Sequence, residues 1–124
     1  MKKLAGILFI ALLVSGCYYD SEEALYPKLD SSCDTTGVTL SKSILPILQT
    51  NCFGCHSTTE NASSGGSINL EVYSSLKQLA GQGNLYGAIT HNPLNIPMPK
   101  DGAKLDTCSI TKIKIWIDKG ALNN

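Results

Sequence analysis

One run of five residues, Cys52-Phe53-Gly54-Cys55-His56, constrains this chain of 124 residues more than any other feature. Pairs of cysteines separated by two residues occur in redox-active disulfides and in structural zinc sites. A histidine directly after the second cysteine narrows these alternatives, because few kinds of site need all three side chains on one short turn. Cys52, Cys55 and His56 are therefore the first candidate residues of a functional site.

The pattern Cys-x-x-Cys-His is the attachment sequence of a c-type haem. Each thiol adds across one vinyl group of the porphyrin, so a short spacing keeps both sulfurs at one edge of the ring. The imidazole of His56 then becomes an axial ligand of the iron. Gly54 carries no side chain that would separate the backbone from the porphyrin. The motif predicts one covalent haem c on Cys52, Cys55 and His56, and a zinc site or a thioredoxin-like pair is the alternative.

The N-terminus has the features of an export signal. Two lysines precede an apolar run that ends near residue 14, and residues 1–16 are predicted to be a signal peptide, too short to cross a membrane as a mature helix. Val14-Ser15-Gly16-Cys17 resembles the lipobox of bacterial lipoproteins, so Cys17 is expected to carry acyl chains; an ordinary signal peptide that leaves Cys17 as a free thiol is the alternative. Residues 17–32 show no helical or strand period and are predicted to be a lipidated tether. The domain would be exported and anchored in the bacterial cell envelope, facing the periplasm or the outer-membrane surface.

Two further cysteines, Cys33 and Cys108, remain once the others have been assigned. An even pair in an oxidising compartment predicts a disulfide, although two separate buried thiols would also satisfy the count. The chain is formally neutral, contains no arginine and becomes mildly acidic if Lys2 and Lys3 are removed with the signal peptide. No basic cluster indicates nucleic-acid binding.

Residues 33–124 are predicted to form one all-α domain, because no segment alternates with a period of two. A first helix would begin near residue 40 or residue 43 and lead into the motif, with Pro46 kinking it in the first case and harmless in the second. The second helix would be capped by Asn69, with Glu71 in its first turn. The predicted helices after the motif cover residues 72–80, 85–90 and 109–119, and in the last of these Ile110, Ile113 and Ile117 form an apolar stripe flanked by Trp116.

A haem that transfers electrons needs a second axial ligand, and Met98 is the methionine that remains after the signal peptide. Met98 lies between Pro97 and Pro99, whose rings restrict the backbone and hold the thioether in a nearly constant direction. An ordinary packing role for Met98 is the alternative. His91 is the rival ligand, which would give bis-histidine coordination, and an open sixth position would allow small ligands to bind.

The order of these segments resembles the mono-haem cytochrome c domains of bacterial envelope lipoproteins. The residues that carry the resemblance are Ile44-Leu45-Pro46-Ile47-Leu48 before Cys52–His56, then Ile96-Pro97-Met98-Pro99-Lys100, and Ile113-Lys114-Ile115-Trp116-Ile117 with Gly120-Ala121. The resemblance implies a class I cytochrome c fold, with about four helices around one covalently bound haem. It also implies electron transfer with His56 and Met98 as axial ligands. The Cys33–Cys108 pair lies outside the general family pattern.

The expected function is that of a membrane-tethered one-electron carrier that exchanges electrons with redox partner proteins of the cell envelope. No cluster of acid, base and nucleophile indicates an enzyme. The alternative is a haem domain whose sixth ligand is displaced by a small ligand or a peroxide. A third hypothesis is a structural zinc domain that uses Cys52, Cys55 and His56.

Overall fold

The computed structural model describes residues 32–124. The predicted signal peptide (residues 1–16), the predicted acylation site Cys17 and nearly all of the predicted tether lie outside the described residues. Within the described residues, no helix is long and apolar enough to cross a membrane.

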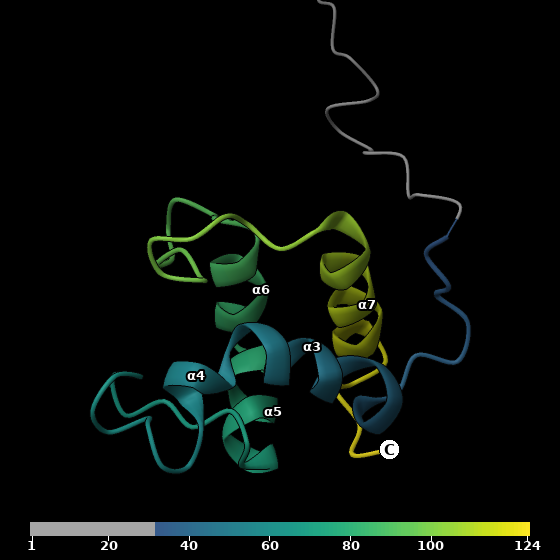
Figure 1. The fold of residues 1–124 in the computed structure, drawn as a ribbon. Coiled ribbons are helices and arrows are strands. Elements are labelled where there is room, and N and C mark those ends of the chain that lie inside the picture. The colour runs from purple at the N-terminus through teal and green to yellow at the C-terminus, as the bar shows by residue number, and fades with distance from the viewer. Residues whose placement is uncertain (1–31) are drawn as a thin grey trace, which may run out of the picture.

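Every regular element in residues 32–124 is helical, which confirms the predicted all-α class. Figure 1 shows the helices gathered into one unit, with α7 upright on one side and α6 on the other. The elements are η1 (Leu40–Ile44), α3 (Leu45–Asn51), α4 (Phe53–His56), α5 (Tyr73–Gly81), α6 (Asn84–Ile89) and α7 (Thr107–Asp118). The predicted helices near residues 72–80, 85–90 and 109–119 are therefore present, with ends shifted by one or two residues.

The helix before the motif is divided where Pro46 enters it. η1 is a π-helical turn in which the N–H of Leu45 donates to the carbonyl of Leu40, and α3 then begins with Pro46 in its first turn. Proline has no N–H and therefore interrupts the regular ladder of hydrogen bonds without disturbing a first turn. Both predicted starting points are thus partly right. The helical segment begins at Leu40, and a separate α-helix, α3, begins at Leu45 with Pro46 in its first turn.

The start of α5 differs from the prediction. Val72 is the N-cap residue, and no side chain caps it. Asn69 instead closes a turn before the helix, where its Oδ1 accepts hydrogen bonds from the N–H groups of Glu71 (2.9 Å) and Val72 (3.3 Å). Glu71 accepts a hydrogen bond from the N–H of Thr58 (2.8 Å). The side chains of Asn69 and Glu71 therefore stabilise the end of the loop that follows the motif, and they do not cap the first turn of α5.

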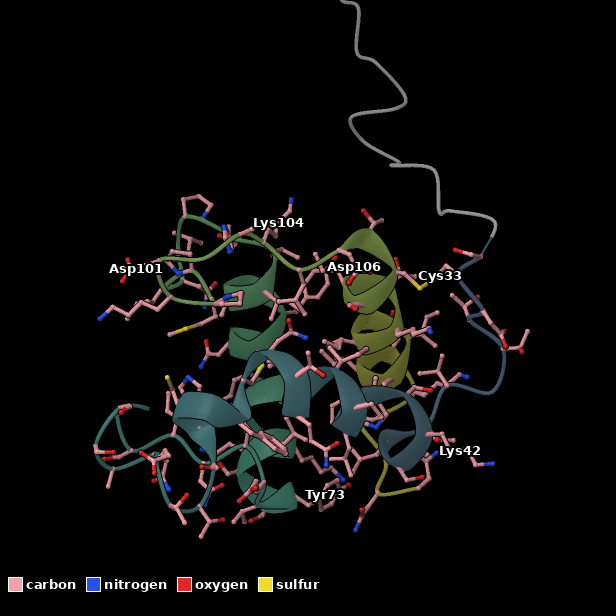
Figure 2. All side chains as sticks on the ribbon, in the orientation of Figure 1. Cys33, Lys42, Tyr73, Asp101, Lys104 and Asp106 are labelled. Carbon is pink, nitrogen blue, oxygen red and sulfur yellow. A yellow bond between two sulfur atoms is a disulfide. The ribbon has the colours of Figure 1, made fainter. Side chains whose placement is uncertain are left out.

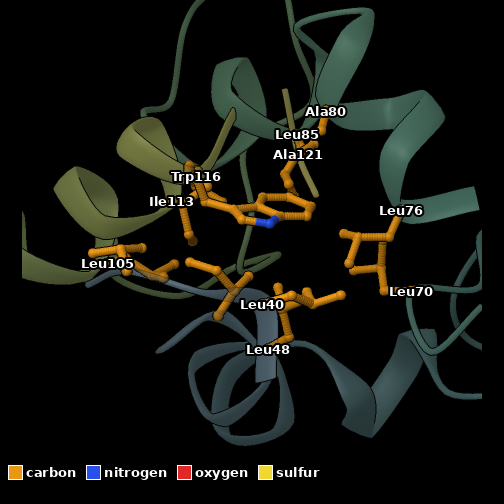
Figure 3. Close-up of a cluster of buried hydrophobic side chains, with 13 residues drawn as sticks. Leu40, Leu48, Leu70, Leu76, Ala80, Leu85, Leu105, Ile113, Trp116 and Ala121 are labelled. Carbon is orange, nitrogen blue, oxygen red and sulfur yellow. The ribbon is translucent and has the colours of Figure 1, made fainter. Parts of the chain in front are cut away.

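The hydrophobic core lies between η1, α3, α5, α6 and α7 (Figure 3). Ile113 and Trp116 of α7 are 0% and 1% exposed, while Ile110 and Ile117 are only partly buried. The buried face of α7 is therefore centred on the pair Ile113 and Trp116, whereas the sequence placed Trp116 beside the stripe. The buried residues are Val38, Leu40, Ile44, Leu48, Leu70, Leu76, Ala80, Leu85, Ile89, Leu105, Ile113, Trp116 and Ala121.

The N-terminal part of the described chain is joined to α7 by a disulfide and to the C-terminal residue by hydrogen bonds. Cys33 and Cys108 form the predicted disulfide, which joins the N-terminal segment to the first turn of α7 (Figure 2). At the other end of α7, Oδ1 of Asn124 accepts a hydrogen bond from the N–H of Leu40 (2.9 Å), and its carbonyl accepts one from Ser41 (2.8 Å). α7 also packs against η1. These contacts hold the first and last helices of the domain together and leave α4 and the loop after α6 on the opposite side of the molecule (Figure 1).

Candidate functional site

Cys52 marks the junction between α3 and α4. Its N–H makes the last hydrogen bond of α3, to the carbonyl of Leu48 (2.8 Å), and its own carbonyl accepts from Cys55 (3.1 Å) and His56 (2.9 Å). The backbone of Cys52 is not helical (φ −127°, ψ −38°), so α4 starts in a new direction. Because residues three and four positions apart share one face of a helical turn, this turn brings Cys52, Cys55 and His56 together.

The two cysteines of the motif are both unpaired, but their surroundings differ. Cys55 is exposed, whereas Cys52 is partly buried and packs against the hydrophobic core. Burial raises the pKa of the Cys52 thiol from 9.0 to about 11. A redox-active or zinc-binding cysteine needs an accessible thiolate, and its pKa is normally lowered. Cys52 is therefore less acidic than a free thiol, and Cys55 is the accessible member of the pair.

The ring of His56 is oriented by a backbone group. Its Nδ1 lies 3.1 Å from the carbonyl oxygen of Ile68. Since a carbonyl oxygen can only accept, Nδ1 donates its hydrogen in this bond, and in the neutral imidazole Nε2 then has the lone pair. Histidine ligands of metals commonly have this arrangement, in which the second ring nitrogen donates to a carbonyl and holds the ring in place. His56 therefore presents Nε2 in the tautomer that an iron ligand requires.

The loop after the motif, whose Ser, Thr, Asn and Gly content over residues 57–67 is typical of a surface loop, packs Gly65 against the motif. The side-chain amide of Asn61 donates to the carbonyls of Ser57 (2.8 Å) and Thr58 (2.9 Å). Gly65 is buried: a Cβ atom at this position would overlap the carbonyl of Cys55 and lie 3.0 Å from Nδ1 of His56. The loop can therefore place its Ile68 carbonyl against His56 only because residue 65 has no side chain.

Sequence reasoning missed both Gly65 and the Ile68 carbonyl. The pair Gly65-Gly66 was the one available signal for the glycine, and nothing in the sequence marks a backbone carbonyl as a partner of a histidine twelve residues away. Gly54, which the sequence singled out, has no neighbouring side chain or loop atom within 4 Å of a Cβ position.

Met98 reaches this side of the molecule on a different segment, the loop of residues 90–106 between α6 and α7. Figure 1 shows this loop extending from the top of α6 on the same side as α4. Met98 is half-buried, and its N–H donates to the carbonyl of Ala88 near the end of α6 (3.0 Å). The fold thus assembles Cys52, Cys55 and His56 on one turn and brings the Met98 loop to the same side.

His91, the rival ligand, belongs to the same loop as Met98. Its Nε2 lies 3.1 Å from the carbonyl oxygen of Met98, so this nitrogen carries a hydrogen and donates it. A ring nitrogen that donates to a carbonyl has no lone pair to offer iron. The geometry therefore disfavours His91 as an axial ligand through Nε2.

Within residues 32–124, no group of three or more histidine, cysteine, aspartate or glutamate side chains is arranged to hold a metal ion.

Comparisons of this chain with protein-family models, with curated proteins and with solved structures found no match.

Proposed function

We propose that residues 33–124 form a class I cytochrome c domain that carries single electrons in the bacterial cell envelope. In this proposal Cys52 and Cys55 form thioethers to one haem c, and His56 and Met98 are its axial ligands. Residues 1–16 would direct export, and Cys17 would anchor the tether at residues 17–32 to the membrane. The partners would be redox proteins of the envelope, and neither catalysis nor nucleic-acid binding is proposed.

The observation that carries this proposal is the hydrogen bond from Nδ1 of His56 to the Ile68 carbonyl. His56 lies on the same helical turn as the two free thiols of Cys52 and Cys55. When the ring is neutral, this hydrogen bond leaves the lone pair on Nε2, the nitrogen that would bind iron in the proposed site. The bound haem would supply an iron centre that changes oxidation state by one electron. This chain's own part is to hold the imidazole ring at one angle, which limits reorganisation when the charge of the site changes.

The arrangement of the helices also favours a class I cytochrome c fold. The first helical segment and α7 meet through the contact of α7 with η1, and the Met98 loop enters from between α6 and α7. A haem attached to α4 would then have His56 on one side and the loop of residues 90–106 on the other. Met98 is the soft thioether ligand in that loop, and such a ligand favours the ferrous state.

The experiment that tests this proposal is a visible spectrum of the protein produced together with c-type haem maturation machinery. The wild-type protein should retain haem after denaturation, because thioethers hold it covalently. Replacing both Cys52 and Cys55 with alanine should abolish this retention. The matched control is the pair Cys33→Ser and Cys108→Ser, which removes two cysteines from the disulfide and should keep the haem attached.

Met98→Ala tests the ligand assignment in the same preparation. Loss of the thioether should remove the near-infrared charge-transfer band expected for methionine-ligated ferric haem, lower the reduction potential and open the site to carbon monoxide. A colourless wild-type protein with one bound zinc would overturn the haem proposal. Rapid binding of carbon monoxide to the reduced wild-type protein would instead support the alternative of a displaceable sixth ligand.

A further inference from the structure

The loop that carries Met98 is attached to the C-terminal end of α6. The last carbonyl groups of a helix have no partners within the helix and are free to accept other hydrogen bonds. The carbonyl of Ala88 accepts from the N–H groups of both His91 (3.2 Å) and Met98 (3.0 Å). The end of α6 thus anchors the loop at both residues.

The carbonyl of Met98 is bound as well, by the side chain of His91. Nε2 of His91 donates to this oxygen at 3.1 Å. Pro97 and Pro99 on either side have no N–H group to contribute. The Met98 backbone is therefore held from two directions, with its N–H on Ala88 and its C=O on His91.

His91 adopts a backbone conformation that most residues avoid. Its φ is +56°, in the left-handed region, where any residue other than glycine pays a free-energy cost because of its Cβ atom. In this conformation the half-buried ring lies over the loop and reaches an oxygen seven residues further along the chain. The hydrogen bond from the ring to Met98 offsets part of the cost of this conformation.

We propose that His91 is a positioning residue for Met98: it holds the backbone of Met98 so that the thioether stays on the haem iron and small ligands stay off it. This inference rests on the proposed function, since it assumes that Met98 is an axial ligand. It assigns His91 a role in the site while excluding it as a ligand through Nε2. Glycine or alanine at this position would leave the Met98 carbonyl without its side-chain donor.

The test compares wild-type protein with His91→Gly, His91→Gln and a control, Asp101→Gly. Glycine adopts the left-handed backbone easily and removes the donor, so this variant separates the hydrogen bond from backbone strain. Glutamine restores an N–H donor of similar reach. Asp101 has the same left-handed backbone (φ +57°) in the same loop and is exposed, which makes Asp101→Gly a matched control for the backbone change.

The readouts are the near-infrared band of the oxidised protein and the rate at which the reduced protein binds carbon monoxide. Loss of one hydrogen bond should make dissociation of Met98 roughly two- to tenfold more favourable, so His91→Gly should bind carbon monoxide faster by that factor and show a weaker band. His91→Gln should return both values toward wild type, and Asp101→Gly should leave both unchanged. Circular dichroism establishes that each variant is folded, and His91→Asn, which tolerates the left-handed backbone but does not reach the carbonyl, replaces His91→Gly if that variant fails to fold.

Three results would overturn the inference, and they are distinguishable. Wild-type rates and band intensity in His91→Gly would show that His91 does not position Met98, and would leave the proposed function intact. Loss of the low-spin spectrum in His91→Gly, with its retention in Met98→Ala, would make His91 the ligand. A wild-type protein without covalent haem would reject the proposed function and this inference together.

Discussion

At the scale of single residues, the candidate site depends on what surrounds His56 as much as on the motif itself. The ring is held by a backbone carbonyl from Ile68, and the loop reaches that position because Gly65 is small. The two cysteines also have different surroundings: Cys52 packs against the hydrophobic core, and Cys55 is exposed to solvent. The chemistry of each motif residue is therefore set by neighbours that the motif does not contain.

We predict that Gly65→Ala disturbs the site without unfolding the domain. The added methyl group would overlap the carbonyl of Cys55 and crowd Nδ1 of His56, so the loop must move and the hydrogen bond to Ile68 must lengthen. Displacing backbone in this way should cost about 1–3 kcal/mol of unfolding free energy. Urea denaturation and haem content after maturation would measure the two effects.

Gly81→Ala is the control for this change, because Gly81 ends α5 with no neighbouring side chain or loop atom within 4 Å of a Cβ position. That variant should keep its haem and be as stable as wild type or slightly more stable. Equal haem content and equal stability in Gly65→Ala and Gly81→Ala would contradict the role given to Gly65.

At the scale of elements, the ends of the helices are determined by side chains next to them. α7 begins at Thr107, two residues before the predicted start, because Asp106 caps it: Oδ1 accepts a hydrogen bond from the N–H of Ser109 at 2.9 Å. Asp106 is a recognised type of N-cap residue, so this signal was present in the sequence. Asn69 is also such a residue, yet it closes a turn instead, because the loop after the motif lies beside it.

The N-cap residue of α7, Asp106, should make the free energy of unfolding depend on pH. Hydrogen bonds from Ser109 lower the pKa of Asp106 below its ordinary value of 3.8. Because the pKa is lower in the folded protein, the charged carboxylate stabilises the fold at pH values above 3.8, and this contribution is lost as the pH falls through the lowered value. Asp106→Ala should lose about 1 kcal/mol at neutral pH.

Asp106→Asn separates the cap from the charge, since asparagine also caps helices but does not titrate. This variant should be about as stable as wild type at pH 7 and lose less stability than wild type in acid. Thermal denaturation followed by circular dichroism from pH 7 to pH 2 would measure the difference. Parallel curves for the wild-type and asparagine proteins over that whole range would show that Asp106 does not contribute in this way.

At the scale of the whole molecule, the stabilising contacts and the candidate site lie on different sides of the domain. One side joins the first and last helices through the core, through Asn124 and through the Cys33–Cys108 disulfide. The other side carries α4 and the Met98 loop (Figure 1). The structural bonds therefore lie on different segments from the residues proposed to hold haem.

Removal of the disulfide should lower the stability of the domain and leave the site chemistry intact. The bond closes a loop of 75 residues, which in the chain-entropy model stabilises the folded state by about 4 kcal/mol. The double variant Cys33→Ser and Cys108→Ser should lose stability of that order in urea denaturation. Its haem spectrum and carbon monoxide binding should match those of wild type, and a changed ligand spectrum would show that the two sides are coupled.

The sequence by itself determined the helical class and the placement of Cys52, Cys55 and His56 on one turn, and it correctly predicted that Cys33 pairs with Cys108. These features are local or follow from a count: hydrophobic period, breakers such as Pro46 and Gly81, residue spacing and cysteine parity all act over a few residues or over the whole composition. Met98 as a ligand and the haem itself are carried by the same kind of evidence and stay predictions.

Only the tertiary structure decided which groups face His56 and His91. The hydrogen bond from His56 to Ile68, the close packing of Gly65 against Cys55 and the hydrogen bond from His91 to Met98 each join residues that lie seven to twelve positions apart across irregular loops. An irregular loop has no hydrophobic periodicity from which the position of a backbone carbonyl could be predicted. Its path is decided by where α4, α6 and the core hold its ends, and that depends on packing across the whole domain.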